Sequence, residues 1–161
     1  MNRCSAFISV LVLLLCVLGC DSPPWSRCII ANSSPKDMVI RFYTPYPLTG
    51  APCVYTPSEW ASDPGSCTKR FRQGFTINEE EKWFEATIPT GGAVEITRYR
   101  YPDIEENPEG NFLIDRLDIH GSSGDISWNG RTQIFSHFQK EGGGPLWYVW
   151  GKSPRYVLYY K

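Results

Sequence analysis

The stretch RCIIANSSPKDMVIRFY, residues 27–43, decides the fold class. It holds two runs rich in β-branched and aromatic residues, RCIIANSS at 27–34 and MVIRFY at 38–43, joined by the turn-forming sequence SPKD. In the second run apolar residues alternate with others, which places Met38, Ile40 and Phe42 on one face of a strand. The stretch predicts two antiparallel strands that form an opening hairpin.

Runs of the same kind continue to the end of the chain, separated by sequences rich in Pro, Gly, Asn and Asp. They are CVYTP at 53–57, KWFEATI at 82–88, AVEITRYRY at 93–101, FLIDRLDIH at 112–120, ISW at 126–128, RTQIFSHFQ at 131–139, and a closing hairpin of LWYVW at 146–150 and RYVLYY at 155–160. Asn129-Gly130 is typical of a tight hairpin turn. We predict an all-β fold, an antiparallel β-sandwich or small barrel of about eight or nine short strands with little helix.

Two segments are harder to assign. Residues 44–80 contain five prolines, which break any long element, so we expect irregular structure or a set of short elements there. For residues 78–88 we prefer a helix or turn up to Glu81 followed by a strand. The alternative is a short helix capped by Asn78, with Glu79, Glu80 and Glu81 in its first turn.

The N-terminus has the pattern of an export signal. Shortly after MNR comes a run of 13 residues, AFISVLVLLLCVL at 6–18, in which every residue but Ser9 is apolar. A transmembrane helix needs about 20 such residues, whereas the apolar core of a signal peptide has about 7–15. The sequence therefore predicts a signal peptide at residues 1–19.

The four residues VLGC at 17–20 resemble the lipobox of bacterial lipoproteins. The resemblance implies that the chain is cut before Cys20 and that the Cys20 thiol carries diacylglycerol and further acyl chains, which together anchor a protein stably. It also implies a place in the cell membrane, on the periplasmic or extracytoplasmic side. Asp21 resembles the signal that keeps enterobacterial lipoproteins in the inner membrane. Simple secretion, with the same cut and a free Cys20, is the alternative.

The cysteines bear on this choice. Four follow the signal peptide, namely Cys20, Cys28, Cys53 and Cys67, so acylation of Cys20 leaves one thiol unpaired, while a free Cys20 allows two bridges. Cys53 and Cys67 flank a Pro/Gly-rich loop of about 15 residues, whose closure would contribute roughly 3 kcal/mol. Pairing of Cys28 with either of them is the rival connectivity. The spacing does not fit a zinc site.

Length and charge define the remaining organisation. We expect a lipidated N-terminus and tether at 20–27 and a single β-domain at 28–161, which is long enough to bury a core. The formal net charge of the whole chain is −1, with acidic and basic residues interspersed, which argues against a nucleic-acid partner. We expect no metal and no cofactor.

The candidates for catalysis are weak. Asp118 and His120 share a strand face, which is half of a catalytic triad, but no Gly-x-Ser-x-Gly motif supplies a nucleophile. Acidic residues at 103, 105, 106 and 109 lack the ligand spacing of a calcium loop. The sequence leaves open whether the protein is an enzyme and favours a binding role.

The closing hairpin is the candidate binding surface. Both of its faces are apolar, which fits either a buried central strand pair or an exposed aromatic platform. The platform would consist of Trp147, Tyr148, Trp150 and Tyr156, with Trp60 contributing to it. The leading hypothesis is a non-enzymatic envelope lipoprotein that binds another protein or serves a structural role. The alternatives are a carbohydrate-binding module for envelope glycan and a hydrolase with an unrecognised acidic site.

Overall fold

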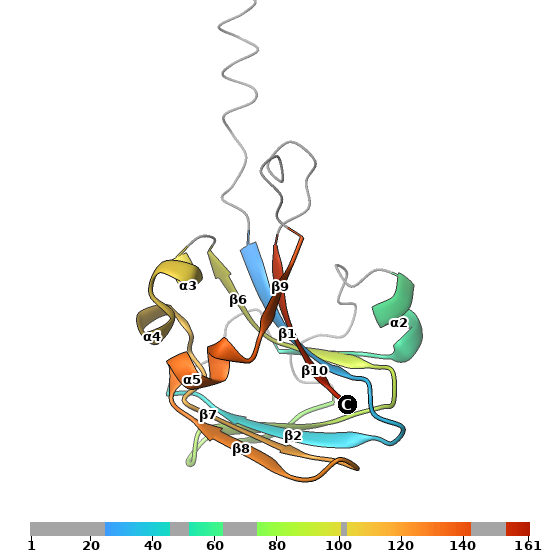
Figure 1. Ribbon diagram of the computed structural model, residues 1–161. Coiled ribbons are helices and arrows are strands. Elements are labelled where there is room, and N and C mark those ends of the chain that lie inside the picture. Colours follow the sequence, from blue (N-terminus) through green and yellow to red (C-terminus); the bar gives the residue numbers. More distant parts are fainter. Residues whose placement is uncertain (1–24, 46–51, 63–73, 101–102, 143–153) are drawn as a thin grey trace, which may run out of the picture.

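A computed structural model describes residues 25–45, 52–62, 74–100, 103–142 and 154–161 (Figure 1). These residues form ten strands and four short helices. The strands are β1 (Trp25–Asn32), β2 (Met38–Tyr43), β3 (Cys53–Tyr55), β4 (Thr76–Asn78), β5 (Trp83–Ile88), β6 (Ala93–Arg100), β7 (Arg116–His120), β8 (Ile126–Asn129), β9 (Gln139–Glu141) and β10 (Arg155–Tyr160). The helices are α2 (Pro57–Ser62), α3 (Asp103–Glu106), α4 (Pro108–Asn111) and α5 (Arg131–Ser136).

The strands form two open sheets of five strands each, which confirms the predicted all-β sandwich. Sheet A has the order β3-β6-β1-β10-β9, and sheet B has the order β4-β5-β2-β7-β8. In Figure 1 the strands of sheet A fan out above those of sheet B. All neighbouring strands are antiparallel except β1 and β10, which run parallel in the middle of sheet A.

The predicted opening hairpin is wrong, although both of its strands exist. β1 pairs with β6 and β10 in sheet A, whereas β2 pairs with β5 and β7 in sheet B. The intervening turn carries the chain from one layer to the other, so that Ile30 and Ile40 face each other's sheet across a common core. Alternation correctly gave the buried face of β2 but could not give its partner.

The turn between these strands is held by the side chain of Asn32, which is 1% exposed. Its Nδ2 donates to the carbonyl oxygens of Lys36 (2.9 Å) and Ile88 (3.0 Å). Its Oδ1 accepts from the backbone N–H (3.0 Å) and the hydroxyl (2.7 Å) of Ser34. One amide thus satisfies polar groups at the point where the chain changes sheets.

The core lies between the two sheets. Its largest fully buried side chains include Phe42, Phe112, Ile40, Ile96 and Leu117. At one end Phe112 contacts the rings of Phe135 and Phe138, with centroid distances of 5.6 and 5.9 Å. A smaller cluster covers the opposite, outer face of sheet A, where Trp60 packs against buried side chains that include Tyr55 and Val157.

Some local predictions were correct. β3 is the short edge strand expected within CVYTP, and Phe84, Ala86 and Ile88 are buried along β5 as expected. Of the helix or turn expected before β5, the structure has a turn, in which the Oδ1 of Asn78 accepts from the N–H of Glu81 (2.9 Å). The described parts of residues 44–80 hold the short elements β3, α2 and β4.

The predicted strand RTQIFSHFQ is wrong: residues 131–136 form α5, and only 139–141 form a strand. Ile134 and Phe138 are four residues apart, a spacing that places side chains on one face of a helix as well as of a strand. Gly130, at φ 93°, precedes the helix instead of closing a hairpin. The acidic segment from Asp103 also holds two helical turns, α3 and α4.

The proposed signal peptide, Cys20 and Asp21 lie outside the described residues. In the described part of the chain, no helix has the length and apolar character needed to cross a membrane.

Candidate binding surface

The predicted aromatic platform is not assembled as expected. Trp147, Tyr148 and Trp150 lie outside the described residues. Tyr156 is 3% exposed and belongs to the core between the sheets, with its ring 5.1 Å from that of Phe135, so its assignment to an exposed surface is wrong.

Trp60 is half-buried on α2, over the outer face of sheet A. Its ring lies 6.1 Å from that of Tyr55 and 5.3 Å from the guanidinium carbon of Arg155. The structure therefore does not bring Trp60 together with Tyr156, the one other predicted platform residue that it describes, because Tyr156 lies in the core between the sheets.

The outer face of sheet B, which we call the sheet B face, carries both polar and aromatic side chains. The core side chains of β2, β5 and β7 point toward sheet A, so the alternate residues of these strands point outward. The register aligns them in two rows across the five strands. One row is Asn78, Trp83, Tyr43, Arg116 and Asn129, and the next is Thr76, Glu85, Arg41, Asp118 and Ser127.

Two arginines on this face stack on the two aromatic rings. The guanidinium carbon of Arg41 lies 4.5 Å from the ring centroid of Trp83, and that of Arg116 lies 5.0 Å from the ring centroid of Tyr43. Each arrangement is a cation–π contact, with the cation over the negative face of the ring. The four side chains restrain one another on a rigid sheet.

The same arginines also pair with carboxylates. Arg41 donates to Glu85 through Nε (2.9 Å) and Nη2 (2.6 Å), and these hydrogen bonds raise the pKa of the Arg41 guanidinium. Arg116 donates to Asp118 through Nε (3.1 Å) and Nη2 (3.0 Å), which raises the pKa of Arg116. Two positive and two negative charges therefore balance at the centre of the sheet B face.

The weak catalytic candidates do not form a relay. Asp118 accepts from Arg116 and from the hydroxyl of Ser127 (2.6 Å), while the Nδ1 of His120 lies 3.1 Å from Asp125. Ser123 instead donates its hydroxyl to the carbonyl oxygen of Lys161. Asp118 and His120 thus have separate partners, and each has a structural role in its own strand or turn.

The acidic segment is likewise occupied by local contacts. Glu105 pairs with Lys140 (2.8 Å), and Glu109 accepts from the hydroxyl of Thr132 (2.8 Å). Within the described ranges, no group of three or more potential ligand side chains is placed to hold a metal ion.

A second charged surface, which sequence analysis missed, lies on the outer face of sheet A. Arg98, Arg27 and Arg155 occupy adjacent strands in register, and Glu141 follows Arg155 on β9. We call these three arginines the arginine row. A β-bulge between β1 and β6 shifts the register there, so that Arg98 comes to the same face as Glu95, three residues earlier.

Glu95 is the counter-charge beneath the arginine row, and its side chain is fully buried. It accepts from Arg98 and from the hydroxyl of Tyr55 (2.8 Å), and it lies 4.0 Å from Arg27. Burial, followed by the proximity of Glu95, raises the pKa of Tyr55 above its ordinary value. Tyr55 therefore stays protonated and donates to the carboxylate.

The cysteines follow only part of the predicted scheme. Cys28 is a free thiol inside the core, which contradicts its pairing with another cysteine, and burial raises its pKa well above the ordinary value. Cys53 is disulfide-bonded. Cys67 lies outside the described residues, so its pairing with Cys53 stays a prediction.

No family model, no curated protein and no solved structure matches this chain. The structure therefore defines this protein by its architecture alone. It is a two-layer β-sandwich with polar and aromatic side chains on one outer face and a row of arginines on the other.

Proposed function

We propose that this chain is an envelope lipoprotein, tethered through Cys20, whose β-sandwich binds another protein through the sheet B face. The VLGC sequence at 17–20 supports the anchor. The stacking of Arg41 on Trp83 and of Arg116 on Tyr43 supports the binding face.

The residue types on this face favour a protein partner. Trp, Tyr and Arg dominate the binding energy of protein interfaces, and the sheet B face has all three on adjacent strands. Their strands belong to a packed sandwich, so little conformational entropy remains to be lost on binding. Because the central charges balance, the interface would gain specificity from matched polar groups more than from long-range attraction.

A glycan is the second candidate, because arginine side chains already cover one face of each aromatic ring. Sugar recognition needs an open aromatic face, and in Trp83 and Tyr43 one face of each ring already contacts a guanidinium group. A glycan is nevertheless favoured by one observation, the exposed amide of Asn129 at the end of the row that contains both rings. This amide would supply a hydrogen-bond donor and an acceptor to hydroxyl groups.

The test is affinity purification of the tagged, membrane-derived protein after cross-linking, with Trp83→Ala as the variant. The matched control is Trp60→Ala, which removes the same ring from the other sheet's outer face. We expect one partner to be captured by the wild type and the control and lost with Trp83→Ala. Equal capture by all three proteins would refute the sheet B face as the site. A glycan pull-down that depends on Trp83 while no protein is captured would support the second candidate instead.

The anchor is tested separately by intact-mass analysis of the same preparation. We expect the mass of a chain that begins at Cys20 and carries acyl groups. An unmodified Cys20 thiol would refute the anchor without affecting the binding face.

A further inference from the structure

The strand β8 forms an edge of sheet B, and part of its backbone faces outward. The N–H of Gly130 donates to the carbonyl oxygen of Asp115 (2.8 Å), in line with the register of β7 and β8. Residues of an antiparallel strand face its two sides alternately, so Trp128 bonds to β7 as Gly130 does. The backbone N–H and C=O groups of Ser127 and Asn129 therefore point away from the sheet.

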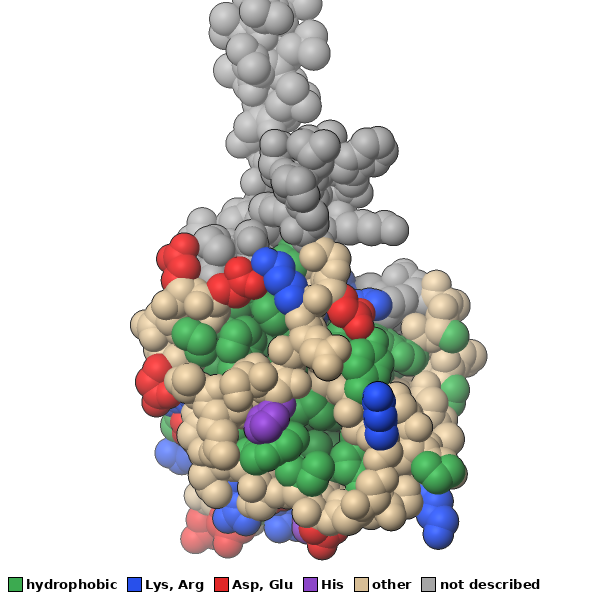
Figure 2. All heavy atoms as spheres, in the orientation of Figure 1, with side chains coloured by type: hydrophobic (Ala, Val, Ile, Leu, Met, Phe, Trp, Pro, Cys, Tyr) green, Lys and Arg blue, Asp and Glu red, His purple; other side chains and the backbone are tan. Residues whose placement is uncertain are grey.

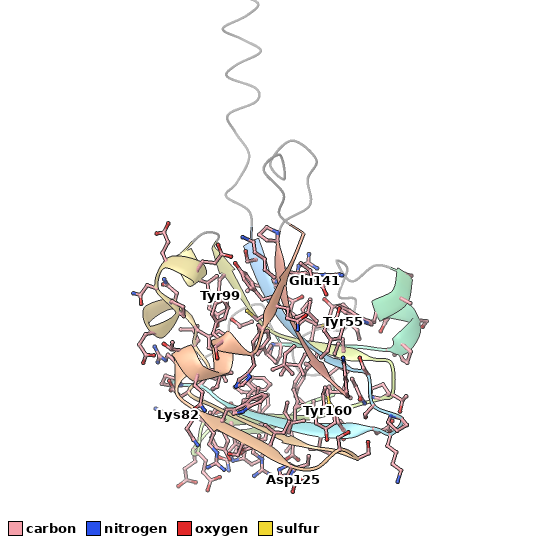
Figure 3. The ribbon with its side chains drawn as sticks, in the orientation of Figure 1. Tyr55, Lys82, Tyr99, Asp125, Glu141 and Tyr160 are labelled. Carbon is pink, nitrogen blue, oxygen red and sulfur yellow. The ribbon has the colours of Figure 1, made fainter. Side chains whose placement is uncertain are left out.

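The other edge strands offer less to a second chain than β8 does. β3, β4 and β9 have three residues each, and β8 has four. Short edge strands and lysine side chains hinder pairing with another chain, and β9 has both, with Lys140 at its centre. β8 has neither lysine nor proline, and the side chains of Ser127 and Asn129 are exposed. In Figure 3, Asp125 before β8 lies at the lower margin of the molecule and Glu141 of β9 in its upper part, so β9 does not cover this edge.

The edge of β8 is complementary to itself. Ser127 and Asn129 are separated by one residue, so a second β8 that runs antiparallel places its Asn129 opposite Ser127 and its Ser127 opposite Asn129. Each of these pairs then exchanges both backbone N–H···O bonds, as in a regular ladder. Neither side chain is charged, so the pairing brings no like charges directly opposite each other.

The same register places Trp128 opposite the Trp128 of the second copy. This is a non-hydrogen-bonded position, where the side chains of antiparallel strands lie closest together. The Trp128 ring packs against the core and is only partly buried, and His137 stacks on it with ring centroids 4.0 Å apart. Figure 2 shows apolar side chains around a histidine on this side of the molecule. A second copy would cover part of this apolar surface, and aromatic cross-strand pairs stabilise a sheet.

We propose that two copies of this chain pair through β8 and join their B sheets into one continuous sheet. Such a pair is isologous, because the same strand contributes on both sides of a two-fold axis. The axis is perpendicular to the sheet, so corresponding faces of the two copies stay on the same side.

This symmetry suits two chains on one membrane. In Figure 1, β1 starts at the end of the body away from sheet B, so the β1 strands of both copies would start on one side of the joined sheet. Two chains tethered at Cys20 can therefore pair without turning one of them over, and tethering raises their effective concentration. The pairing itself rests on the β8 edge and does not depend on the anchor.

Cysteine cross-linking of the full chain in membranes tests the register. Opposite residues of a hydrogen-bonded pair have Cα atoms about 5.5 Å apart, within the range of a disulfide. Residue 127 of one copy would lie about 9 Å from residue 127 of the other, which is too far for a disulfide. We therefore expect a covalent dimer on oxidation when a chain with Ser127→Cys and a chain with Asn129→Cys are expressed together, and not when either is expressed alone.

The matched control is a chain with Thr76→Cys expressed with a chain with Asn78→Cys. These positions have the same spacing on β4, at the opposite edge of sheet B. The wild type reports any linkage through the native cysteines. Equal cross-linking by the β4 pair or by Ser127→Cys alone would show that the contact is not this one, and absence of cross-linking by the β8 pair would overturn the proposal as well.

Asn129→Pro tests the backbone bonds in a second way. Proline is tolerated where a strand N–H faces outward, so each copy should keep the melting temperature of the wild type. The pair loses the Asn129 N–H donor from both copies, which should weaken association by about twentyfold. Analytical ultracentrifugation of the membrane-derived protein in detergent measures this, and Asn129→Ala, which keeps the N–H, is the control. A wild type that stays monomeric, or equal association by the proline and alanine variants, would overturn the proposal.

Discussion

The change of sheet between β1 and β2 should depend on a single side chain, that of Asn32. Substitution by alanine removes the four hydrogen bonds of the Asn32 side chain. Their partner groups then lack the amide, among them the carbonyl oxygen of Ile88, a fully buried residue. A typical intramolecular hydrogen bond contributes about 1 kcal/mol net, and a buried group left unpaired costs about 1–3 kcal/mol. Water can hydrate the exposed side of the turn near Lys36. We therefore expect Asn32→Ala to lower the free energy of unfolding by about 3 kcal/mol.

The assay is urea unfolding followed by tryptophan fluorescence, together with a thermal melt. For a domain of this size about 3 kcal/mol corresponds to a melting temperature lower by roughly 10 °C. Ser33→Ala is the matched control, because Ser33 lies next to Asn32 with an exposed side chain and should change stability by less than about 0.5 kcal/mol.

A double-mutant cycle with Ser34→Ala isolates the pair. The Ser34 hydroxyl donates to Asn32 and is also within 2.8 Å of the carbonyl oxygen of Lys36. We expect a coupling free energy above about 0.5 kcal/mol between the two substitutions. If Asn32→Ala destabilises the protein by less than about 1 kcal/mol, the Asn32 amide does not hold the turn between β1 and β2.

Three further predictions concern groups inside the fold. Gly121→Ala should destabilise the protein by about 1–3 kcal/mol in urea unfolding, because a Cβ at Gly121 would lie 2.6 Å from the buried ring of Tyr160; an unchanged midpoint would contradict this steric argument. Burial raises the pKa of the Cys28 thiol, which should react with a maleimide only as fast as the protein unfolds. Mass spectrometry of the peptide that contains Cys28 measures this rate, and rapid labelling of the native protein would show that the core opens at Cys28. Burial raises the pKa of both Tyr55 and Tyr99. The unfolded chain therefore loses these protons first, and the free energy of unfolding should decrease as pH rises above about 10; a flat profile between pH 9 and 11 would count against it.

The sequence predicts strand positions well where one face of a strand is buried and the other is exposed to solvent. In β2 and β5 this alternation is clear, and Phe42 and Phe84 are buried as it predicts. It does not predict which strands pair, because alternation indicates the buried face of a strand but not its neighbour in the sheet. The error at 131–136 has a related origin, because the spacing of Ile134 and Phe138 fits one face of a strand as well as one face of a helix.

The binding surface was misjudged where both faces of a strand are apolar. In β10 Tyr156 and Leu158 face the core between the sheets, while Val157 is buried on the other side of sheet A. The sequence of such a strand cannot indicate which face is covered. The sheet B face had a signal in its own strands, the polar partners of each alternation, such as Arg41 in β2 and Glu85 in β5. Only the register shows that these residues form continuous rows.

The arginine row could not be predicted because it depends on an irregularity. In a regular strand Glu95 and Arg98 would point to opposite faces, being three residues apart. The bulge in the pairing of β1 and β6 brings them together, and the parallel pairing of β1 with β10 then sets Arg155 beside Arg27. Neither the bulge nor a parallel pair between the first and last strands has a marker in the local sequence.

The sandwich keeps its two outer faces apart. Stacked sheets lie about 10 Å apart and present their outer faces in opposite directions. Arg155 and Trp60 lie on the outer face of sheet A, so their substitution should leave binding through the sheet B face unchanged. Loss of the partner with Arg155→Gln as well as with Trp83→Ala would show that binding is not confined to sheet B, and the assignment of the site to the sheet B face would have to be given up.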